Sequence, residues 1–339
     1  MRFAFTDDQK LFRDTVRALL DKECTADVVR KAWDPETNGR SPPLWGKLAE
    51  LGVVGLRVPE AHGGLGLSEI DFVLLLEESG RAALPEPIVE TSAVGAPLLA
   101  EIGDASLASA WLPRIATGNA RLTVGLAGSA FVADAHVADL LLIQQGGDLY
   151  ALSRDDVKLV PEHSVDGARR LFRVIWDPSP SKRVASGSAA RAVLARSFDR
   201  GALGASAMLL GLGRHLIDVT VEYVKVRKQF GSPIGSFQAV KHHLADALVK
   251  LEFARPIVYR AAYSMSRTPD AASLHVSMAK AYASDAALLA ARAALQCHGA
   301  IGYSYEHDLH LWMKRAWALA AAWGDASWHR ARVGELVLG

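Results

Sequence analysis

The chain has 339 residues, of which 50% are apolar and 22% are charged, and its formal net charge is +1. This composition is that of an ordinary globular protein, and the near-neutral charge argues against nucleic acid or an anionic membrane surface as a partner. Only two cysteines occur, which indicates a reducing compartment without a disulfide framework. The N-terminus lacks an apolar signal core and the longest apolar runs are too short to cross a bilayer, so we expect a cytoplasmic protein without a membrane span.

The first third of the sequence predicts helices. Thr6 and Gln9 form a capping-box pattern, and apolar residues follow them at helical spacing. A leucine stripe over 44–51 ends at Gly52, Ser68 can cap a helix over 69–81, and a further helical stretch lies around 105–118. The sequence HGGLG at 62–66 neither follows a strand nor opens a G-x-G-x-x-G helix turn, so we interpret it as a structural loop.

The middle of the chain changes from helical to strand-like patterns. Two apolar runs flank Gly146 and Gly147, which is typical of a hairpin. Phe172, Val174 and Trp176 then alternate on one face before a proline-containing turn. We therefore predict a small β domain at residues 123–187, between a helical domain at 1–122 and a second helical region at 188–339.

The last region predicts long helices rich in alanine and leucine. One ends at Gly231, a second follows the turn GSPIG, a third covers about 271–297 and the last covers about 306–322. Helices of this length and composition suit a close-packed bundle. His242 and His243 lack metal-ligand spacing to other residues, so we expect them on a helix surface and predict no metal site. The predicted fold class is mainly α with a small β domain.

Two motifs carry a resemblance to a known family. They are RKQFGSPIGSFQAVKHHLAD at 227–246 and QCHGAIGYSYE at 296–306, and the earlier VPEAHGGLG and LLEESGR precede them in the expected order. Over nearly its whole length the chain resembles the acyl-CoA dehydrogenase family. The resemblance implies an N-terminal helical domain, a middle β domain that is truncated here and a C-terminal four-helix bundle. It also implies a tetramer with FAD at a subunit interface.

The resemblance implies a set of FAD contacts. Arg227 matches an arginine that reaches the flavin pyrophosphate of a neighbouring subunit, and a guanidinium donates two charge-assisted hydrogen bonds to a diphosphate at once. Ala300 replaces the usual second glycine of a segment whose backbone approaches phosphate oxygens. The residues alone favour a surface position for Arg227 and a core position for Phe230. The implied set is Arg227, Gln229, Phe230, Gln238, Gln296, Cys297, His298, Gly299 and Ala300.

The catalytic base that the family needs is missing from its usual positions. The family's reaction removes the α proton of an acyl thioester with a glutamate and passes the β hydrogen to the flavin as hydride. The usual glutamate position falls on Trp323 and the alternative one at about Gly201, and neither residue is a base. The remaining acidic candidates are Asp199, Glu306 and Asp325. The family's strand motifs that hold the flavin ring are absent as well.

Three functions therefore remain open. The favoured one is a non-catalytic subunit that donates FAD contacts to a homologous catalytic partner, which would bind most of the acyl-CoA and pass electrons to an electron-transfer acceptor. It resembles the short subunits of bacterial heterotetramers, with two copies of each chain, that act on CoA esters of steroid side chains in lipid β-oxidation. The alternatives are a self-sufficient acyl-CoA dehydrogenase with a relocated base and a flavin-free scaffold protein of the same fold.

Overall fold

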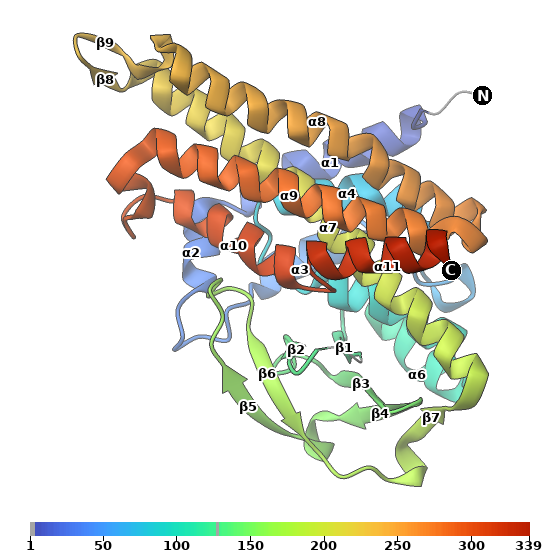
Figure 1. Ribbon diagram of the computed structural model, residues 1–339. Helices are drawn as coiled ribbons and strands as arrows, with labels where there is room; N and C mark the ends of the chain where they lie inside the picture. The colour runs from blue at the N-terminus through green and yellow to red at the C-terminus, as the bar shows by residue number, and fades with distance from the viewer. Residues whose placement is uncertain (1–3, 127–128) are drawn as a thin grey trace.

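The computed structural model describes residues 4–126 and 129–339 and shows a helical body with a small β domain at one end (Figure 1). The predicted capping box begins the first helix, where Gln9 and Thr6 exchange hydrogen bonds. The glycine-rich segment is a loop from Gly63 onward, as predicted, whereas His62 ends the short helix η1. A π-helix, η2, occupies Val89–Gly95, where the sequence pattern predicted no helix. The other N-terminal helices are α1 (Asp7–Glu23), α2 (Ala26–Ala32), α3 (Pro42–Glu50), η1 (Glu60–His62), α4 (Glu69–Arg81), α5 (Ala96–Glu101) and α6 (Ala105–Ala116).

The β domain consists of two small sheets. One has the order β1-β3-β4-β7, in which β1 and β3 are parallel and the other pairs are antiparallel. The other has the antiparallel order β2-β6-β5. The predicted hairpin is confirmed, because Gln145 pairs with Asp148 across the two glycines. The strands are β1 (Leu122–Gly125), β2 (Val132–Ala133), β3 (Leu140–Gln145), β4 (Asp148–Ser153), β5 (Lys158–Glu162), β6 (Leu171–Ile175) and β7 (Arg183–Ala185).

Long helices form the C-terminal bundle, in which α9 packs against α7 and α8. The predicted last helix at 306–322 was wrong in one respect, because a further helix follows it after a tight turn. His242 and His243 are exposed on α8, as expected. The elements are α7 (Gly187–Val226), β8 (Lys228–Gln229), β9 (Ser232–Pro233), α8 (Gln238–Arg267), α9 (Ala272–His298), η7 (Gly299–Tyr303), α10 (Leu309–Ala321) and α11 (Ala326–Leu338).

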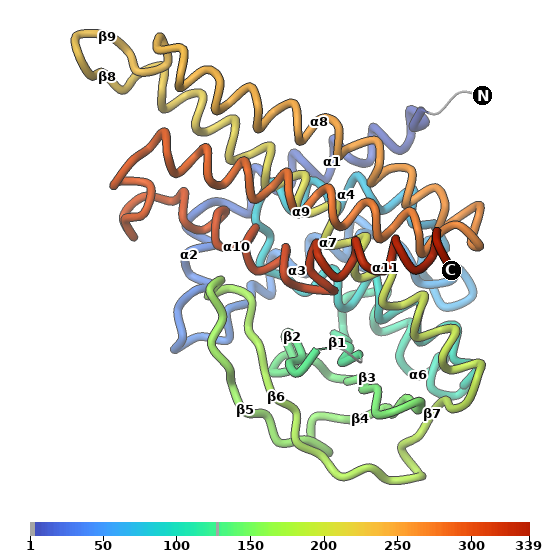
Figure 2. The backbone as a smooth tube through the Cα atoms, viewed as in Figure 1, coloured from blue at the N-terminus to red at the C-terminus, as the bar shows by residue number. Residues whose placement is uncertain are grey.

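The helix α7 joins the three parts of the molecule. By length and composition it is apolar enough to cross a membrane, but 78% of its most apolar window is buried inside the protein, so it is a core helix. It crosses α4 very closely, since a Cβ on Gly211 would lie 1.9 Å from the Glu77 carbonyl oxygen. A continuous apolar core runs from the N-terminal helices through the first sheet into the bundle. The turn between α10 and α11 faces the β domain (Figures 1 and 2).

Candidate functional site

Trp323 occupies a strained turn between α10 and α11. Its φ is +58°, a left-handed conformation that is unusual for a bulky residue and costs on the order of 1–3 kcal/mol. Two buried side chains hold the turn in place. His329 donates an Nε2–H hydrogen bond to the Trp323 carbonyl at 2.8 Å, and the Lys280 ammonium donates to the Ala320 and Gly324 carbonyls, each at 2.9 Å. The surrounding structure thus fixes the position of the indole.

The indole of Trp323 covers Gly201 of α7. A Cβ placed on Gly201 would lie 2.4 Å from the indole, closer than any real Cβ contact. The two positions at which the resemblance implies a base are therefore in contact, and neither carries an acid. The large side chain at one position requires the absence of a side chain at the other.

The other acidic candidates have structural roles or lie on the surface. Asp199 is buried, accepts a hydrogen bond from Ser273 at 2.6 Å and forms an ion pair with Arg332. Asp325 caps α11 by accepting the Trp328 backbone N–H at 2.8 Å. Glu306 is exposed and accepts a hydrogen bond from Ser304. Asp199 is therefore engaged elsewhere, and of these three only Asp325 lines the cavity described next.

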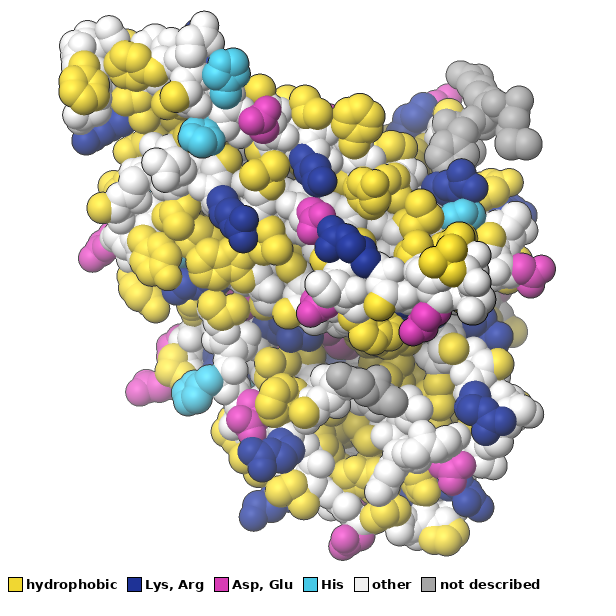
Figure 3. Space-filling view, in the orientation of Figure 1, with side chains coloured by type: hydrophobic (Ala, Val, Ile, Leu, Met, Phe, Trp, Pro, Cys, Tyr) yellow, Lys and Arg dark blue, Asp and Glu magenta, His cyan; other side chains and the backbone are white. Residues whose placement is uncertain are grey.

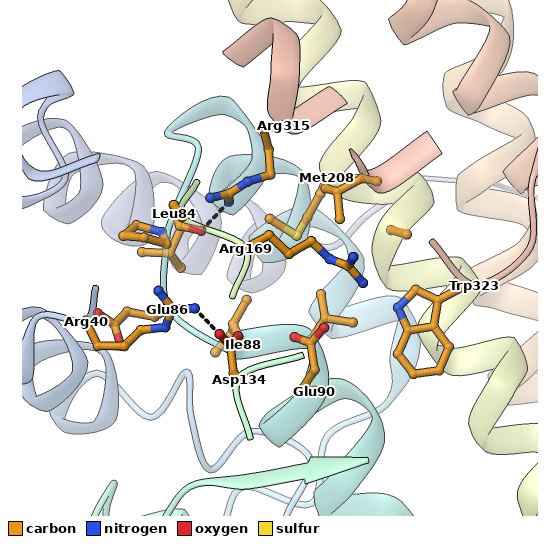
Figure 4. A pocket seen from close by; sticks show the side chains of 15 residues that line it. Arg40, Leu84, Glu86, Ile88, Glu90, Asp134, Arg169, Met208, Arg315 and Trp323 are labelled. Carbon is orange, nitrogen blue, oxygen red and sulfur yellow. Dashed lines mark hydrogen bonds and ion pairs between the residues drawn. The ribbon is translucent and has the colours of Figure 1, made fainter. Parts of the chain in front are cut away.

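A cavity of about 510 Å³ opens between the β domain and the α10–α11 turn. We call it the Trp323 cleft. It contains Trp323, Glu90 of η2 and Arg169 from the loop before β6. The same three residues line the smaller adjoining pocket that Figure 4 shows, where Glu90 lies opposite Trp323. Burial and the neighbouring Asp134 raise the pKa of the Glu90 carboxyl. The aromatic residues of its lining are Phe131, Phe198, Trp323 and Trp328.

Sequence reasoning missed both Glu90 and Arg169. Glu90 had a usable signal, because it is a single carboxyl in the largely apolar stretch from Ile88 to Leu99. Arg169 had none, because RRLF reads as the beginning of a strand and gives no indication of which arginine faces a cavity. The pairing of Trp323 with Gly201 was likewise inaccessible, since the two residues are far apart in the chain.

The residues implied as FAD contacts gather at one end of the bundle. Arg227 directly follows α7, Gln229 and Phe230 lie in the β8–β9 hairpin, and Gln238 begins α8. The His298 ring at the end of α9 stacks on Tyr223 with ring centroids 4.1 Å apart, one turn before Arg227. The structure therefore brings the two sequence motifs together.

Several members of this set are exposed, and their side chains lack polar partners in the part of the chain that the structure describes. The side chains of Arg227 and Gln238 are exposed and have no hydrogen-bond or ion-pair partner within residues 4–126 and 129–339. Gly299 has a φ of +65° and open space where a Cβ would stand, which leaves its backbone accessible to a phosphate. Phe230 is 91% exposed. Cys297 and His298 are buried, so their side chains face the protein interior and only their backbone could contribute.

This end of the bundle lies far from the Trp323 cleft. The β8–β9 hairpin projects from the opposite end of the long helices, away from the β domain (Figures 1 and 2). The space-filling view shows apolar side chains gathered over the hairpin and along α8, where a folded monomer would normally be polar (Figure 3). A dinucleotide held by Arg227 would therefore lie outside the cleft of its own chain.

The chain matches two models of one protein family. Residues 6–119 match the model of the acyl-CoA dehydrogenase N-terminal domain and residues 191–338 match that of the C-terminal domain. Neither of these two models extends over the β domain. The chain is 34% identical to acyl-CoA dehydrogenase IpdE2 of Mycolicibacterium smegmatis over 92% of this chain and 93% of that protein.

Two further matches concern chain length and assembly. FadE34 of Mycobacterium tuberculosis, an acyl-CoA dehydrogenase, is 31% identical over 98% of this chain but only 48% of that protein. A solved structure of a Tcur3481-Tcur3483 steroid ACAD variant is 26% identical, covers 98% of each chain and superimposes with a TM-score of 0.89.

Proposed function

Because the chain belongs to the acyl-CoA dehydrogenase family, we propose that it is the non-catalytic subunit of a heteromeric acyl-CoA dehydrogenase. The packing of Trp323 on Gly201 carries this proposal. Trp323 occupies one of the two positions implied for the base, and its indole leaves no room for an acidic side chain at the other, Gly201. The acid would then come from a homologous partner.

In this proposal the chain contacts an FAD whose ring is bound by the partner subunit. The Arg227 guanidinium would bind the pyrophosphate, Gln229 and Phe230 would contact the adenosine half, and Gln238 and the Gly299 backbone would complete the dinucleotide site. FAD, when bound, supplies the oxidising capacity for α,β-dehydrogenation of an acyl-CoA. This chain would orient the cofactor and exclude water from its phosphates, while the partner binds most of the substrate and meets the electron-transfer acceptor.

Two findings about relatives support a paired assembly. The segment of FadE34 that matches this chain is about half of that protein, which leaves length for a second chain of this size. The similar Tcur3481-Tcur3483 structure bears two protein names and is described as a steroid ACAD. We therefore propose a CoA ester of a steroid side chain as the substrate class, a role in lipid and steroid β-oxidation, and a cytoplasmic location.

The proposal is tested by co-expression with a candidate catalytic subunit. We expect the chain alone to be colourless and inactive on acyl-CoA, and the co-purified complex to carry one flavin for each pair of unlike subunits. Absorbance at the flavin band and native mass measurement give both values. Stoichiometric flavin and turnover in the chain alone would overturn the proposal, and the absence of flavin with every partner would leave the scaffold alternative.

One observation favours a second candidate, a self-sufficient enzyme with a relocated base. Glu90 faces the Trp323 cleft, forms no ion pair among the described residues, and has a raised pKa, as a general base of the family would require. Under this candidate the chain alone would bind flavin and turn over, and Glu90→Gln would abolish turnover. The Asp325→Asn variant is its control, because Asp325 lines the same cleft but serves to cap α11.

A further inference from the structure

Arg169 is placed in the Trp323 cleft by a loop that is fixed on both sides of it. Three residues before it, the buried Asp166 forms an ion pair with Arg315 of α10. The Arg315 guanidinium also donates to the Leu84 carbonyl at 2.8 Å. On the other side, Arg170 donates to the Ala32 carbonyl at 3.1 Å. The backbone at Arg169 is thus held in place before any ligand arrives.

Arg169 itself has no ion pair or side-chain hydrogen bond with any residue that the structure describes. Its guanidinium is half-buried and extends toward the indole of Trp323 (Figure 4). Partial burial of a cation without a partner is unfavourable, so a fixed unpaired arginine in a cavity indicates an anionic ligand.

The acidic groups around the cleft leave this cation largely uncompensated. Glu90 is near enough to interact with Arg169 electrostatically but forms no ion pair with it, and burial raises its pKa toward the neutral form. Asp134 is already paired with Arg40 in a buried ion pair. Asp325 accepts the backbone N–H of Trp328. These carboxyl groups would also repel a dianion more strongly than a monoanion.

The rest of the lining selects a rigid apolar body. Rings of Phe131, Phe198, Trp323 and Trp328 stand around the cavity, and its volume of about 510 Å³ is within the range of small-molecule sites. A rigid ring system fills such a space with less loss of conformational entropy than a flexible chain. Flat aromatic walls also contact fused rings over large areas.

We propose that the Trp323 cleft is a ligand site of this chain, which takes a ring-bearing carboxylate with its carboxylate on Arg169 and its rings against Trp323. The planar guanidinium fork matches a carboxylate through two parallel hydrogen bonds. The site goes beyond the donation of FAD contacts and does not require it, because all of its residues come from one chain. It would give the subunit its own means of sensing ring-bearing acids.

The test uses the full chain and two probes, cholate and 2-naphthoate, each below its aggregation concentration. Binding is measured by calorimetry, with cholate methyl ester as the neutral analogue of cholate and inorganic phosphate as a competing anion. We expect cholate to bind at least about tenfold more tightly than its methyl ester, because only the acid makes the charge-assisted pair. Phosphate should not compete.

The variant Arg169→Gln should weaken cholate at least about tenfold and leave the methyl ester nearly unchanged. Arg173→Gln is the control, since Arg173 lies on β6 outside the cleft and pairs with Glu162. If Arg169→Gln does not fold, Arg169→Lys carries the test, because it keeps the charge and loses the fork. Absence of binding by both probes, equal affinity for acid and ester, or competition by phosphate would overturn the site. Flavin content and subunit ratio of the complex are unaffected by that failure, so the proposed function is tested separately.

Discussion

At the scale of single residues, Arg227 allows the clearest test of the proposed cofactor site. Replacing it with alanine would leave a diphosphate without its charged partner in a site that the partner subunit desolvates. The loss of such a pair costs about 2–5 kcal/mol, which is roughly a thirtyfold to several-thousandfold weaker flavin affinity. The change in flavin affinity is measured from the flavin that the co-purified complex retains after dialysis.

The control for Arg227→Ala is Lys225→Ala. Lys225 is a cation on the same last turn of α7, but it pairs with Glu222 at 2.7 Å and is expected to have no role in cofactor binding. Unchanged flavin in Arg227→Ala would contradict donation from this residue. Equal loss in both variants would indicate a general effect of charge at this end of the bundle.

His215 allows a prediction about pH. Its imidazole stacks on the Trp312 indole, with the ring centroids 4.2 Å apart. Burial lowers the pKa of this imidazole to about 4. Between pH 6.5 and 4 the unfolded chain therefore binds a proton that the folded chain does not, and stability from this group is lost as the pH falls through that window. The slope is at most about 1.4 kcal/mol per pH unit. Burial also lowers the pKa of His329 to about 4, so it contributes in the same direction.

Buried carboxyl groups act in the opposite direction, since the pKa values of Glu77, Glu86 and Glu90 are raised in the folded state. The test therefore compares the wild type with His215→Phe, which keeps the ring stack and removes the titration. Urea unfolding at pH 7, 5.5 and 4.5 should show that the variant gains stability relative to the wild type as the pH falls. A constant difference would show that His215 titrates normally.

At the scale of elements, α7 and the α10–α11 turn are coupled through Gly201 and Trp323. Gly201→Ala places a methyl group inside the indole and should destabilise the chain by about 1–3 kcal/mol, as overpacking does. In a Trp323→Ala background the same change should cost little, because the obstacle is gone. Thermal or urea unfolding of the four combinations gives the coupling. Additive effects would contradict the contact.

Gly46→Ala is the matched control for Gly201→Ala. Gly46 lies inside α3 with no atom near the position of an added Cβ. Alanine there should stabilise the helix by up to about 1 kcal/mol, because it reduces the entropy of the unfolded chain without a collision. The two substitutions should therefore have opposite signs.

The elements differ in how far the sequence predicted them. The capping box at Thr6, the hairpin at Gly146 and the long bundle helices follow from local periodicity and turn residues, so they were predictable. The π-helix η2 was not, because its conformation depends on packing against α7 and β1. The added helix α11 was also missed, although Asp325 at its N-cap gives a recognisable signal.

The candidate site divides in the same way. The motifs around Arg227 and Gln296 are continuous stretches of sequence, so the sequence alone could identify them. The Trp323 cleft is assembled from η2, the loop before β6 and the α10–α11 turn, which only the fold brings together. The unpaired state of Arg169 depends on how the fold places Glu90, Asp134 and Asp325 around it, and no sequence pattern records that.

At the scale of the whole molecule, the exposed apolar surface over α8 and the β8–β9 hairpin supports the proposed partner. Phe230 and Phe253 are 91% and 69% exposed, and exposed apolar side chains that gather on one face are typical of a protein–protein interface. In the proposed heterotetramer a homologous chain buries this surface, and its FAD then meets Arg227. The other exposed apolar residues of this region are Val226, Phe237, Val249, Tyr282, Ile301 and Tyr303.

Phe253→Glu should separate assembly from folding. A carboxylate in the centre of an apolar interface is desolvated without a partner, so association with the catalytic subunit should weaken by at least about tenfold. The isolated chain should unfold at nearly the same temperature, because Phe253 contributes little to its own core. Ile175→Glu is the control, since Ile175 is 49% exposed on β6 in the β domain. Native mass measurement should then find the heterotetramer in the wild type and the control but separate subunits in Phe253→Glu, and an intact complex in all three would place the partner on another face.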